Sequence, residues 1–429
     1  MIFKELEIFR QKLYGELGRS KAALFDLMDA LLTTPATPSL VQVSLSPLFR
    51  RQWSSAFKAI ENFRWNSNSL MRWLLQFVVV GEGMLVMALD HTPWARLYAK
   101  TLKERTIEHQ PTVVQGNKPI TVGHGYSTLA VIPEMEGSWV LPLRHERITS
   151  FETAITKGVF QLKQACRHLS KRPLLLADSE YANAKFLKAT IGVEADLLMR
   201  LRPNRVLYGP PPAYSGKGRP RVHGARFALK EYQDWPQADQ YEEVVDSQKG
   251  RIRIRLWSQL HFRQSPQVPF STLCIEYLER PRQSPLWLMW RGQTELSLNA
   301  LREFYQRRFT IEHWNRLAKQ RLHWNLPLWG STQQGERWSR LLLLLSWQLW
   351  FARDELLGAA LPWQKPQTLP SPGRVAQNFI HVLACIGSPA PDPKPRGKGK
   401  GCPPGEARRH PLFYPSVKRR AKRPPKKAA

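Results

Sequence analysis

Two short apolar runs, each ending in an aspartate, constrain the fold of this chain more than any other feature. The first covers residues 84–90 and ends in Asp90, and the second covers residues 173–178 and ends in Asp178. Short runs without a polar interruption are typical of strands that are buried inside a sheet. Each run therefore predicts a core strand with a carboxylate directly at its end.

Further strands and helices are expected around these two runs. Residues 127–132 and 139–143 resemble the arms of an antiparallel pair, and residues 196–201 look like a third core strand. Helices are expected from about residue 150 to 168, where apolar residues recur with a helical period, and from 182 to 191. The order of three strands, helix, strand, helix and strand fits a mixed α/β sheet.

Composition divides the chain into five segments. Residues 1–80 have the apolar period of helices, which is compatible with a helix-turn-helix-like DNA reader and equally with a structural cap. Residues 81–202 and 291–387 are expected to be the two parts of the core, separated by a β-rich insertion at 203–290. Residues 388–429 are rich in Pro, Gly, Lys and Arg, which predicts a disordered, phosphate-binding basic tail.

Charge indicates the partner. The chain has 64 Lys and Arg against 34 Asp and Glu, a net charge of +30. A surplus of this size favours a polyanion, and nucleic acid is the leading candidate. No apolar run is both long and uninterrupted enough to cross a bilayer of about 30 Å, so no membrane partner is expected. The scattered cysteines, without a CxxC pair, favour reduced thiols over a disulfide framework or a zinc site.

Four polar residues share one side of an expected helix near the C-terminal end of the core. Tyr305, Arg308, Glu312 and Lys319 are spaced so that, at 3.6 residues per turn, they lie on one narrow stripe. A carboxylate flanked by two cations and a phenol contributes little to a hydrophobic core. Such a stripe suits the binding of a metal ion beside a phosphate, although a solvated surface helix can present the same pattern.

Three carboxylates from distant parts of the chain combine into one candidate site. An aspartate after a strand is most often a turn or helix cap, so Asp90 or Asp178 alone indicates little. Together with Glu312 they supply the hard oxygen ligands that Mg²⁺ or Mn²⁺ prefers. Two such ions about 3.5–4 Å apart can carry out phosphodiester chemistry. Glu180, two residues past Asp178, is a reserve ligand.

At these residues the chain resembles a known family. Tyr305, Arg308, Glu312 and Lys319 match the Y-(2)-R-(3)-E-(6)-K signature of a group of bacterial DDE transposases, the enzymes of cut-and-paste insertion sequences. Residues 89–92 look like the first aspartate region of that family, and residues 176–181 look like the second. The resemblance covers roughly residues 80–350. It implies an RNase H-like core with the β-rich insertion between the second Asp and the Glu-bearing helix.

The resemblance also implies roles. Asp90, Asp178 and Glu312 would coordinate two Mg²⁺ ions, and Tyr305, Arg308 and Lys319 would hold DNA phosphates. Water would first hydrolyse the phosphodiester at the element end, and the freed 3′-hydroxyl would then attack target DNA. Transposon ends and target DNA would be the partners, with a homodimer assembled on DNA. The expected location is the cytoplasm of a prokaryote, associated with the nucleoid when bound to DNA.

Two further basic features are candidates for DNA contact. The loop with Lys217, Arg219 and Arg221 resembles hooks that insert arginine into the minor groove, and a flexible basic loop is the other reading. Residues 251–256 alternate arginine with apolar residues, which fits either a strand that follows the DNA backbone or a solvated edge strand.

Two alternatives to a transposase remain open. A metal-dependent nuclease or resolvase on the same fold would cut DNA without joining it to a target. A non-catalytic DNA-binding protein derived from a transposase would bind without cutting. Metal-dependent nicking distinguishes the second alternative from an enzyme, and strand transfer distinguishes a transposase from a nuclease.

Overall fold

A computed structural model describes residues 3–78, 83–109, 119–280, 282–356, 362–363, 370–395 and 410–418. The helices are α1 (Lys4–Glu16), α2 (Lys21–Thr33), α3 (Leu40–Val43), α4 (Trp53–Asn62), α5 (Ser67–Leu75), α6 (Ala154–Cys166), α7 (Ala184–Ala189), α8 (Leu298–Arg307), α9 (Thr310–Gln320), α10 (Thr332–Ala352) and α11 (Pro372–Ile386). The strands are β1 (Val86–Ala95), β2 (Thr106–His109), β3 (Ile120–Ile132), β4 (Leu141–Ile148), β5 (Leu174–Ala177), β6 (Asp196–Leu201), β7 (Val206–Tyr208), β8 (Arg226–Ala228), β9 (Gln240–Asp246), β10 (Gly250–Leu260), β11 (Phe270–Tyr277) and β12 (Leu286–Arg291).

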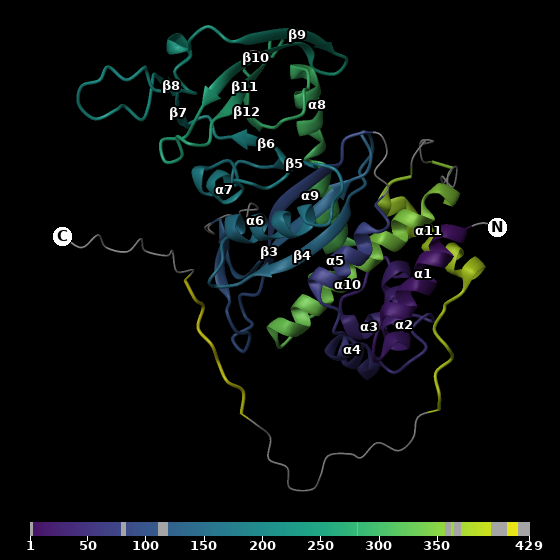
Figure 1. Ribbon diagram of the computed structural model, residues 1–429. Coiled ribbons are helices and arrows are strands. Elements are labelled where there is room, and N and C mark those ends of the chain that lie inside the picture. The colour runs from purple at the N-terminus through teal and green to yellow at the C-terminus, as the bar shows by residue number, and fades with distance from the viewer. Residues whose placement is uncertain are drawn as a thin grey trace.

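Within the described residues, one ten-stranded sheet runs through the molecule (Figure 1). Its central strands follow the order β4-β3-β1-β5-β6. The β4–β3 and β3–β1 pairs are antiparallel, whereas β1–β5 and β5–β6 are parallel. This is the arrangement of an RNase H-like mixed sheet, so the predicted fold class is confirmed.

The insertion extends this sheet. Strand β12 pairs antiparallel with β6, and β11, β10 and β9 follow outward, while β7 and β8 form a separate two-stranded sheet. Because β10 lies between β11 and β9, it is not the solvated edge strand considered from the sequence. Its three arginines do not form an unpaired basic face either, since each has a glutamate partner: Arg251–Glu279 at 3.5 Å, Arg253–Glu243 at 3.0 Å and Arg255–Glu276 at 2.5 Å.

Alternating side chains of the central strands build a core on each face of the sheet. On β1, Met87 and Leu89 face the larger core, which includes α6 and α10. Val86 and Ala88 face the smaller core, where α8 packs through Leu301. Because successive strand residues point to opposite faces, residue 90 is directed to the α8 side. This alternation decides where the first aspartate is presented.

The N-terminal helices pack against the C-terminal part of the chain. Helices α1 and α2 contact α10, and α2 also contacts α11, at the lower right of Figure 1. The buried Arg10 of α1 donates to Asp29 of α2 at 2.7 Å and to Gln348 of α10 at 2.6 Å. None of the described helices is long and apolar enough to span a membrane.

Most of the predicted basic tail, at 396–409 and 419–429, lies outside the described residues. The described stretch 410–418 lies against β2, where Val417 forms a parallel bridge with Thr106. This part of the tail therefore has a defined contact with the sheet, which composition did not predict.

Candidate active site

The two predicted aspartates occupy adjacent positions on neighbouring parallel strands. Leu89 of β1 pairs with Ala177 of β5, and Asp90 and Asp178 are the next residues along each strand. The sequence placed both at strand ends, but β1 continues to Ala95 because it remains paired with β3. Only β5 ends here. Neighbouring strands lie about 4.8 Å apart, so the sheet itself brings the two carboxylates together.

Asp90 is held in an environment that disfavours its charge. Burial, and next the charge of Asp178, raise the pKa of Asp90 from 3.8 to about 7, while Arg308 and His91 act in the opposite direction. Two neighbouring carboxylates, one of them desolvated, form a site where a cation lowers the electrostatic energy. The donor set therefore fits a hard divalent ion at these two positions.

Helix α9 crosses β1 at this point and bonds to it twice. The side-chain amide of Asn315 donates to Oδ2 of Asp90 at 2.8 Å, and Lys319 donates to the hydroxyl of Thr92 at 2.6 Å. Four residues of helix advance about 6 Å and two residues of strand about 6.6 Å. The two spacings match, so the pair of contacts fixes the position of α9 along β1.

The helix expected to carry the polar stripe is in fact two helices. Helix α8 ends at Arg307, and α9 begins at Thr310. Across the junction the backbone makes i to i−3 hydrogen bonds, from Arg308 to Tyr305 at 3.1 Å and from Glu312 to Phe309 at 3.1 Å. This tighter turn breaks the helical period assumed from the sequence.

One cleft of about 930 Å³ contains most of the predicted site. Asp90, Asp178, Glu312, Arg308 and Lys319 all line it, although they come from β1, from the end of β5, and from the α8–α9 region. Side chains from segments far apart in the sequence thus meet at one opening. Its charges are mixed, as expected for a site that binds both cations and phosphates.

The carboxylate of Glu312 is hydrogen-bonded to the neighbouring Arg308. Its Oε1 accepts from the guanidinium of Arg308 at 2.5 Å, and its side chain is 38% exposed. In the part of the chain that the structure describes, no three His, Cys, Asp or Glu side chains are grouped closely enough to hold a metal. As they stand, Asp90 and Asp178 fit a shared ion, whereas Glu312 is directed to Arg308.

A match to one protein-family model identifies the family of this chain. The family model described as DDE superfamily endonuclease matches residues 12–262, more than half of the 429 residues. This chain belongs to the DDE superfamily of endonucleases. The match contains Asp90 and Asp178 and ends before Glu312.

No curated protein matches this DDE endonuclease at a significant level. A solved structure of piggyBac transposase in a synaptic complex with hairpin DNA is similar at 9% sequence identity and a TM-score of 0.41. The likeness covers 90% of this chain and 80% of that one.

Tyr305 is separated from the cleft that the rest of the stripe lines. Its side chain packs in the smaller core with Leu301 and Ile311 and is 7% exposed. Burial raises the pKa of Tyr305 to about 12, while the charges of Arg308 and Arg200 lower it. The phenol of this endonuclease therefore lies behind Arg308 instead of at the surface of the cleft.

The basic loop lies elsewhere on the endonuclease. Lys217, Arg219 and Arg221 are all exposed, in the loop between β7 and β8 that projects from the insertion (Figure 1). None of the three lines the cleft. These three basic residues therefore lie on the β7–β8 loop, separate from the cleft that contains the carboxylates.

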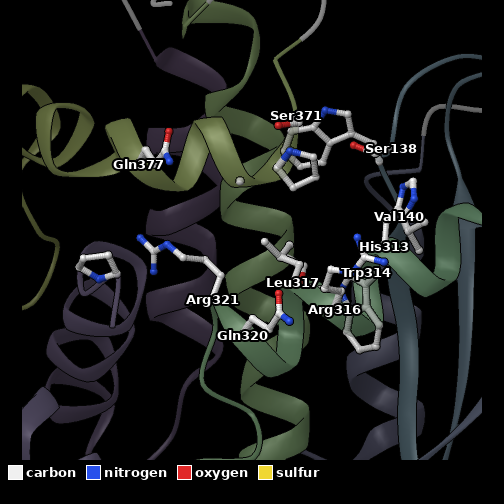
Figure 2. Close-up of a pocket in the computed structure, with 15 residues that line it drawn as sticks. Ser138, Val140, His313, Trp314, Arg316, Leu317, Gln320, Arg321, Ser371 and Gln377 are labelled. Carbon is white, nitrogen blue, oxygen red and sulfur yellow. Dashed lines mark hydrogen bonds between the residues drawn. The ribbon is translucent and has the colours of Figure 1, made fainter. Parts of the chain in front are cut away.

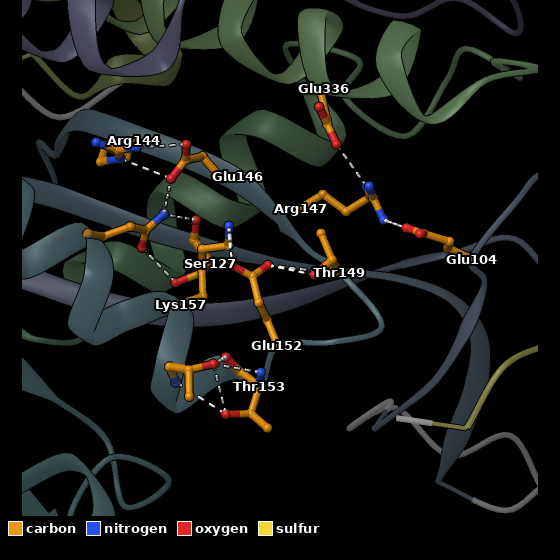
Figure 3. A network of polar contacts seen from close by, with 12 residues as sticks. Glu104, Ser127, Arg144, Glu146, Arg147, Thr149, Glu152, Thr153, Lys157 and Glu336 are labelled. Atoms are coloured by element: carbon orange, nitrogen blue, oxygen red, sulfur yellow. Dashed lines mark hydrogen bonds and ion pairs between the residues drawn. The ribbon is translucent and has the colours of Figure 1, made fainter. Parts of the chain in front are cut away.

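A buried polar network stabilises the sheet beside Asp90 (Figure 3). Ser127 of β3, which pairs with His91 of β1, donates to Gln161 of α6 at 2.7 Å, and Gln161 donates to Glu146 at 3.1 Å. Arg144 binds Glu146 with two hydrogen bonds of 2.9 Å each. These contacts connect β4 and α6 to β3, the strand that pairs with the Asp90-bearing strand β1.

The opposite side of α9 is anchored separately (Figure 2). Trp314 donates to Ser346 of α10 at 2.9 Å, and Arg321 donates to the carbonyl groups of Leu31, Leu32, Thr34 and Ala376. A second cavity of about 570 Å³ lies on this side, lined by His313, Leu317 and Gln377 among others. It contains none of the predicted site residues.

Asn315 is the main residue that sequence reasoning missed. It also lines the cleft, as do Thr92 and Arg202. Its position, three after Glu312 and four before Lys319, is on the same helical stripe, so the spacing argument that found those two residues also applies to Asn315. Glu180, the reserve ligand, also lines the cleft, with its carboxylate 3.7 Å from Nδ1 of His91.

Proposed function

We propose that this endonuclease is a DNA transposase of the bacterial insertion-sequence type, which cuts its element from DNA and joins it to a target. The observation that carries the proposal is the pairing of Asp90 and Asp178 at adjacent strand positions in a cleft that Glu312 also lines. Membership of the DDE superfamily and the net charge of +30 support DNA as the substrate.

Asp90, Asp178 and Glu312 would hold Mg²⁺ or Mn²⁺. When bound, these ions activate the attacking oxygen and stabilise the leaving oxygen of the phosphodiester. The chain's own contribution is to orient the ligands. Asn315 holds the carboxylate of Asp90, and the backbone N–H of Glu180 donates to Oδ1 of Asp178 at 2.9 Å.

Arg308 and Lys319 would bind DNA phosphates, with Tyr305 supporting Arg308 from the core. The Arg308–Glu312 pair suggests an exchange of partners. When Glu312 turns to a metal ion, the guanidinium of Arg308 becomes available for a phosphate, which it can bind with two hydrogen bonds. The exposed Lys217, Arg219 and Arg221 would contact DNA away from the cleft.

The reaction would proceed in two displacements. Water attacks the phosphodiester at the element end, which leaves a 3′-hydroxyl and a 5′-phosphate. The 3′-hydroxyl then attacks a target phosphodiester, forms the new bond and releases the target's own 3′-hydroxyl. A homodimer on DNA would hold the two element ends together, and the cytoplasm of a prokaryote would be its setting.

The test is a joining assay with DNA that borders the gene of this protein. With Mg²⁺, a transposase produces both a cut at the element end and a product in which that end is joined to target DNA. Cutting without joining indicates a nuclease. Binding without cutting indicates a DNA-binding protein that has lost its chemistry. Either of these two results overturns the proposal.

A further inference from the structure

The cavity between α9 and α11 lies behind α9, on the side that faces away from the cleft (Figure 2). Its volume of about 570 Å³ is within the roughly 300–1,000 Å³ that small-molecule sites usually have. Helix α9 contributes to both openings, because Glu312 and Lys319 line the cleft whereas His313 and Arg316 line the cavity. A ligand in this α9–α11 cavity would therefore contact the helix that carries Glu312 without entering the cleft.

Apolar side chains form the walls of the α9–α11 cavity. Trp314 and Leu317 come from α9, and Trp139 lies just before β4. The indole N–H of Trp314 donates to Ser346 at 2.9 Å, and that of Trp139 donates to the carbonyl of Pro370 at 2.8 Å. Since both indole N–H groups are occupied, these walls offer a ligand apolar contact, which suits a flat ring.

The ionisable groups of the cavity are all basic. His313, Arg316 and Arg321 line it, and its described lining residues include no Asp or Glu. Burial lowers the pKa of Arg321 to about 10, and no carboxylate counters that effect. Arg316 is exposed and has no hydrogen-bond or ion-pair partner in the described part of the chain. This surplus of positive charge favours an anionic ligand, and a guanidinium can bind a phosphate with two hydrogen bonds.

A free amide adds a third kind of contact. Gln377 of α11 lines the cavity, is exposed, and makes no hydrogen bond to another described residue. A side-chain amide offers an acceptor and two donors, the combination with which glutamine binds the edge of adenine. Gln377 and Arg316 belong to different helices, α11 and α9. A ligand that reaches both must carry a polar ring edge and, away from it, an anionic group.

We propose that the α9–α11 cavity binds a mononucleotide, whose base packs against the apolar walls and meets the amide of Gln377 while its phosphate binds Arg316. Inorganic phosphate would use only the charge of the cavity, and an uncharged aromatic molecule only its walls and amide. A mononucleotide uses all three. Because the cavity and the cleft lie on opposite sides of α9, this nucleotide is a free one and not part of a strand that occupies the cleft.

The test measures the binding of deoxyadenosine monophosphate (dAMP) to the full-length protein by isothermal titration calorimetry, in EDTA so that no metal ion holds the phosphate in the cleft. Deoxyadenosine, which lacks the phosphate, and inorganic phosphate are titrated in parallel. Arg316→Gln removes the cation and Gln377→Ala removes the amide, both at exposed positions. Arg202→Gln removes a cation that lines the cleft and is the matched control.

The wild type is expected to bind dAMP at least about tenfold more tightly than deoxyadenosine or inorganic phosphate. Arg316→Gln should weaken dAMP binding by roughly ten- to a hundredfold, and Gln377→Ala by roughly fivefold, the effect of one neutral hydrogen bond. Arg202→Gln should leave the Kd unchanged. The proposal is overturned if the wild type does not bind dAMP, if deoxyadenosine or inorganic phosphate binds as tightly, if Arg316→Gln binds like wild type, or if Arg202→Gln loses as much affinity as Arg316→Gln.

Discussion

The amide nitrogen of Asn315 lies 2.8 Å from Oδ2 of Asp90, and this hydrogen bond joins the helix of Glu312 to the strand of the first aspartate. The other end of the amide, Oδ1 of Asn315, is buried, and no group among the described residues donates a hydrogen bond to it. The hydrogen bond that the nitrogen makes to Asp90 therefore sets the orientation of this amide. Asn315 thus positions Asp90 relative to Glu312.

Asn315→Ala is expected to slow DNA cutting by roughly ten- to a hundredfold, since a hydrogen bond to a charged group contributes about 1.5–3 kcal/mol. The same change raises the pKa of Asp90, because the amide favours the charged carboxylate, so the rise of activity with pH moves to higher pH. Single-turnover cutting rates across pH measure both effects. Gln320→Ala, at an exposed position on α9, is the control, and a wild-type rate in Asn315→Ala would refute the positioning role.

Asp90 makes the metal-free protein less stable as pH rises. Its folded-state pKa of about 7 is above the ordinary 3.8, so the folded state binds a proton that the unfolded state has lost. The stabilisation is complete below 3.8 and is lost as pH rises through 7. A divalent ion that binds the ionised carboxylate should therefore raise Tm more at roughly pH 8 than at roughly pH 6.

Thermal melts with and without Mg²⁺ measure this effect. In Asp90→Asn, the metal-free protein should be more stable than wild type at the higher pH, because the buried charge is gone. The Mg²⁺-induced gain in Tm should disappear in the same variant. A pH-independent gain in the wild type, or an undiminished gain in Asp90→Asn, would show that the ion binds elsewhere.

Glu312→Gln separates chemistry from stability. The Arg308–Glu312 pair is an i,i+4 contact with a partly exposed carboxylate, so its loss should change the free energy of unfolding by no more than about 0.5 kcal/mol. Cutting should be lost nevertheless, because the third metal ligand is missing. Glu303→Gln on α8, whose exposed carboxylate pairs with Arg302, is the matched control. Denaturant unfolding measures the stability of both variants, and a cutting assay measures their activity. If Glu312→Gln still cut DNA, Glu312 would be excluded as a metal ligand.

The β7–β8 loop is expected to add affinity without affecting chemistry. Changing Lys217, Arg219 and Arg221 to Ser should weaken DNA binding and lower the salt slope by about 0.9 for each phosphate that the loop no longer neutralises. The rate of cutting in the bound complex should not change. Changing the exposed Lys4, Lys163 and Lys188 to Ser removes equal charge from α1, α6 and α7 and serves as control. Equal weakening by both triple variants would mean that the loop acts only through net charge.

The sequence predicted the central sheet well because its strands are buried and apolar. The run at 196–201 coincides with β6, and the expected antiparallel pair is β3 and β4. Strand β2 was missed, since four residues with alternating exposure carry little signal. The pairing of β12 with β6, and so the continuation of the sheet into the insertion, depends on long-range contacts that no local pattern encodes.

The site was predicted in part. Helical spacing placed Arg308, Glu312 and Lys319 together, and all three line the cleft. Tyr305 fits the same spacing but lies in the core, because the chain tightens between α8 and α9. The spacing of residues in the sequence cannot reveal a local change in the backbone hydrogen bonds of a helix. Helical spacing also cannot reveal the hydrogen bond from Arg308 to Glu312, because that bond depends on side-chain conformation.

The most direct measurement is Mg²⁺-dependent cutting by Asp178→Asn of DNA from the borders of the protein's own gene. Asparagine keeps the oxygen that accepts from the Glu180 N–H and removes only the charge. Asp234→Asn, at an exposed aspartate of the insertion, is the control. Wild type and control should cut with Mg²⁺ and not with EDTA, whereas Asp178→Asn should be slower by a factor on the order of a thousand, equivalent to about 4 kcal/mol. Cutting by Asp178→Asn at the wild-type rate would contradict the assignment of Asp178 as a metal ligand and, with it, the proposed site.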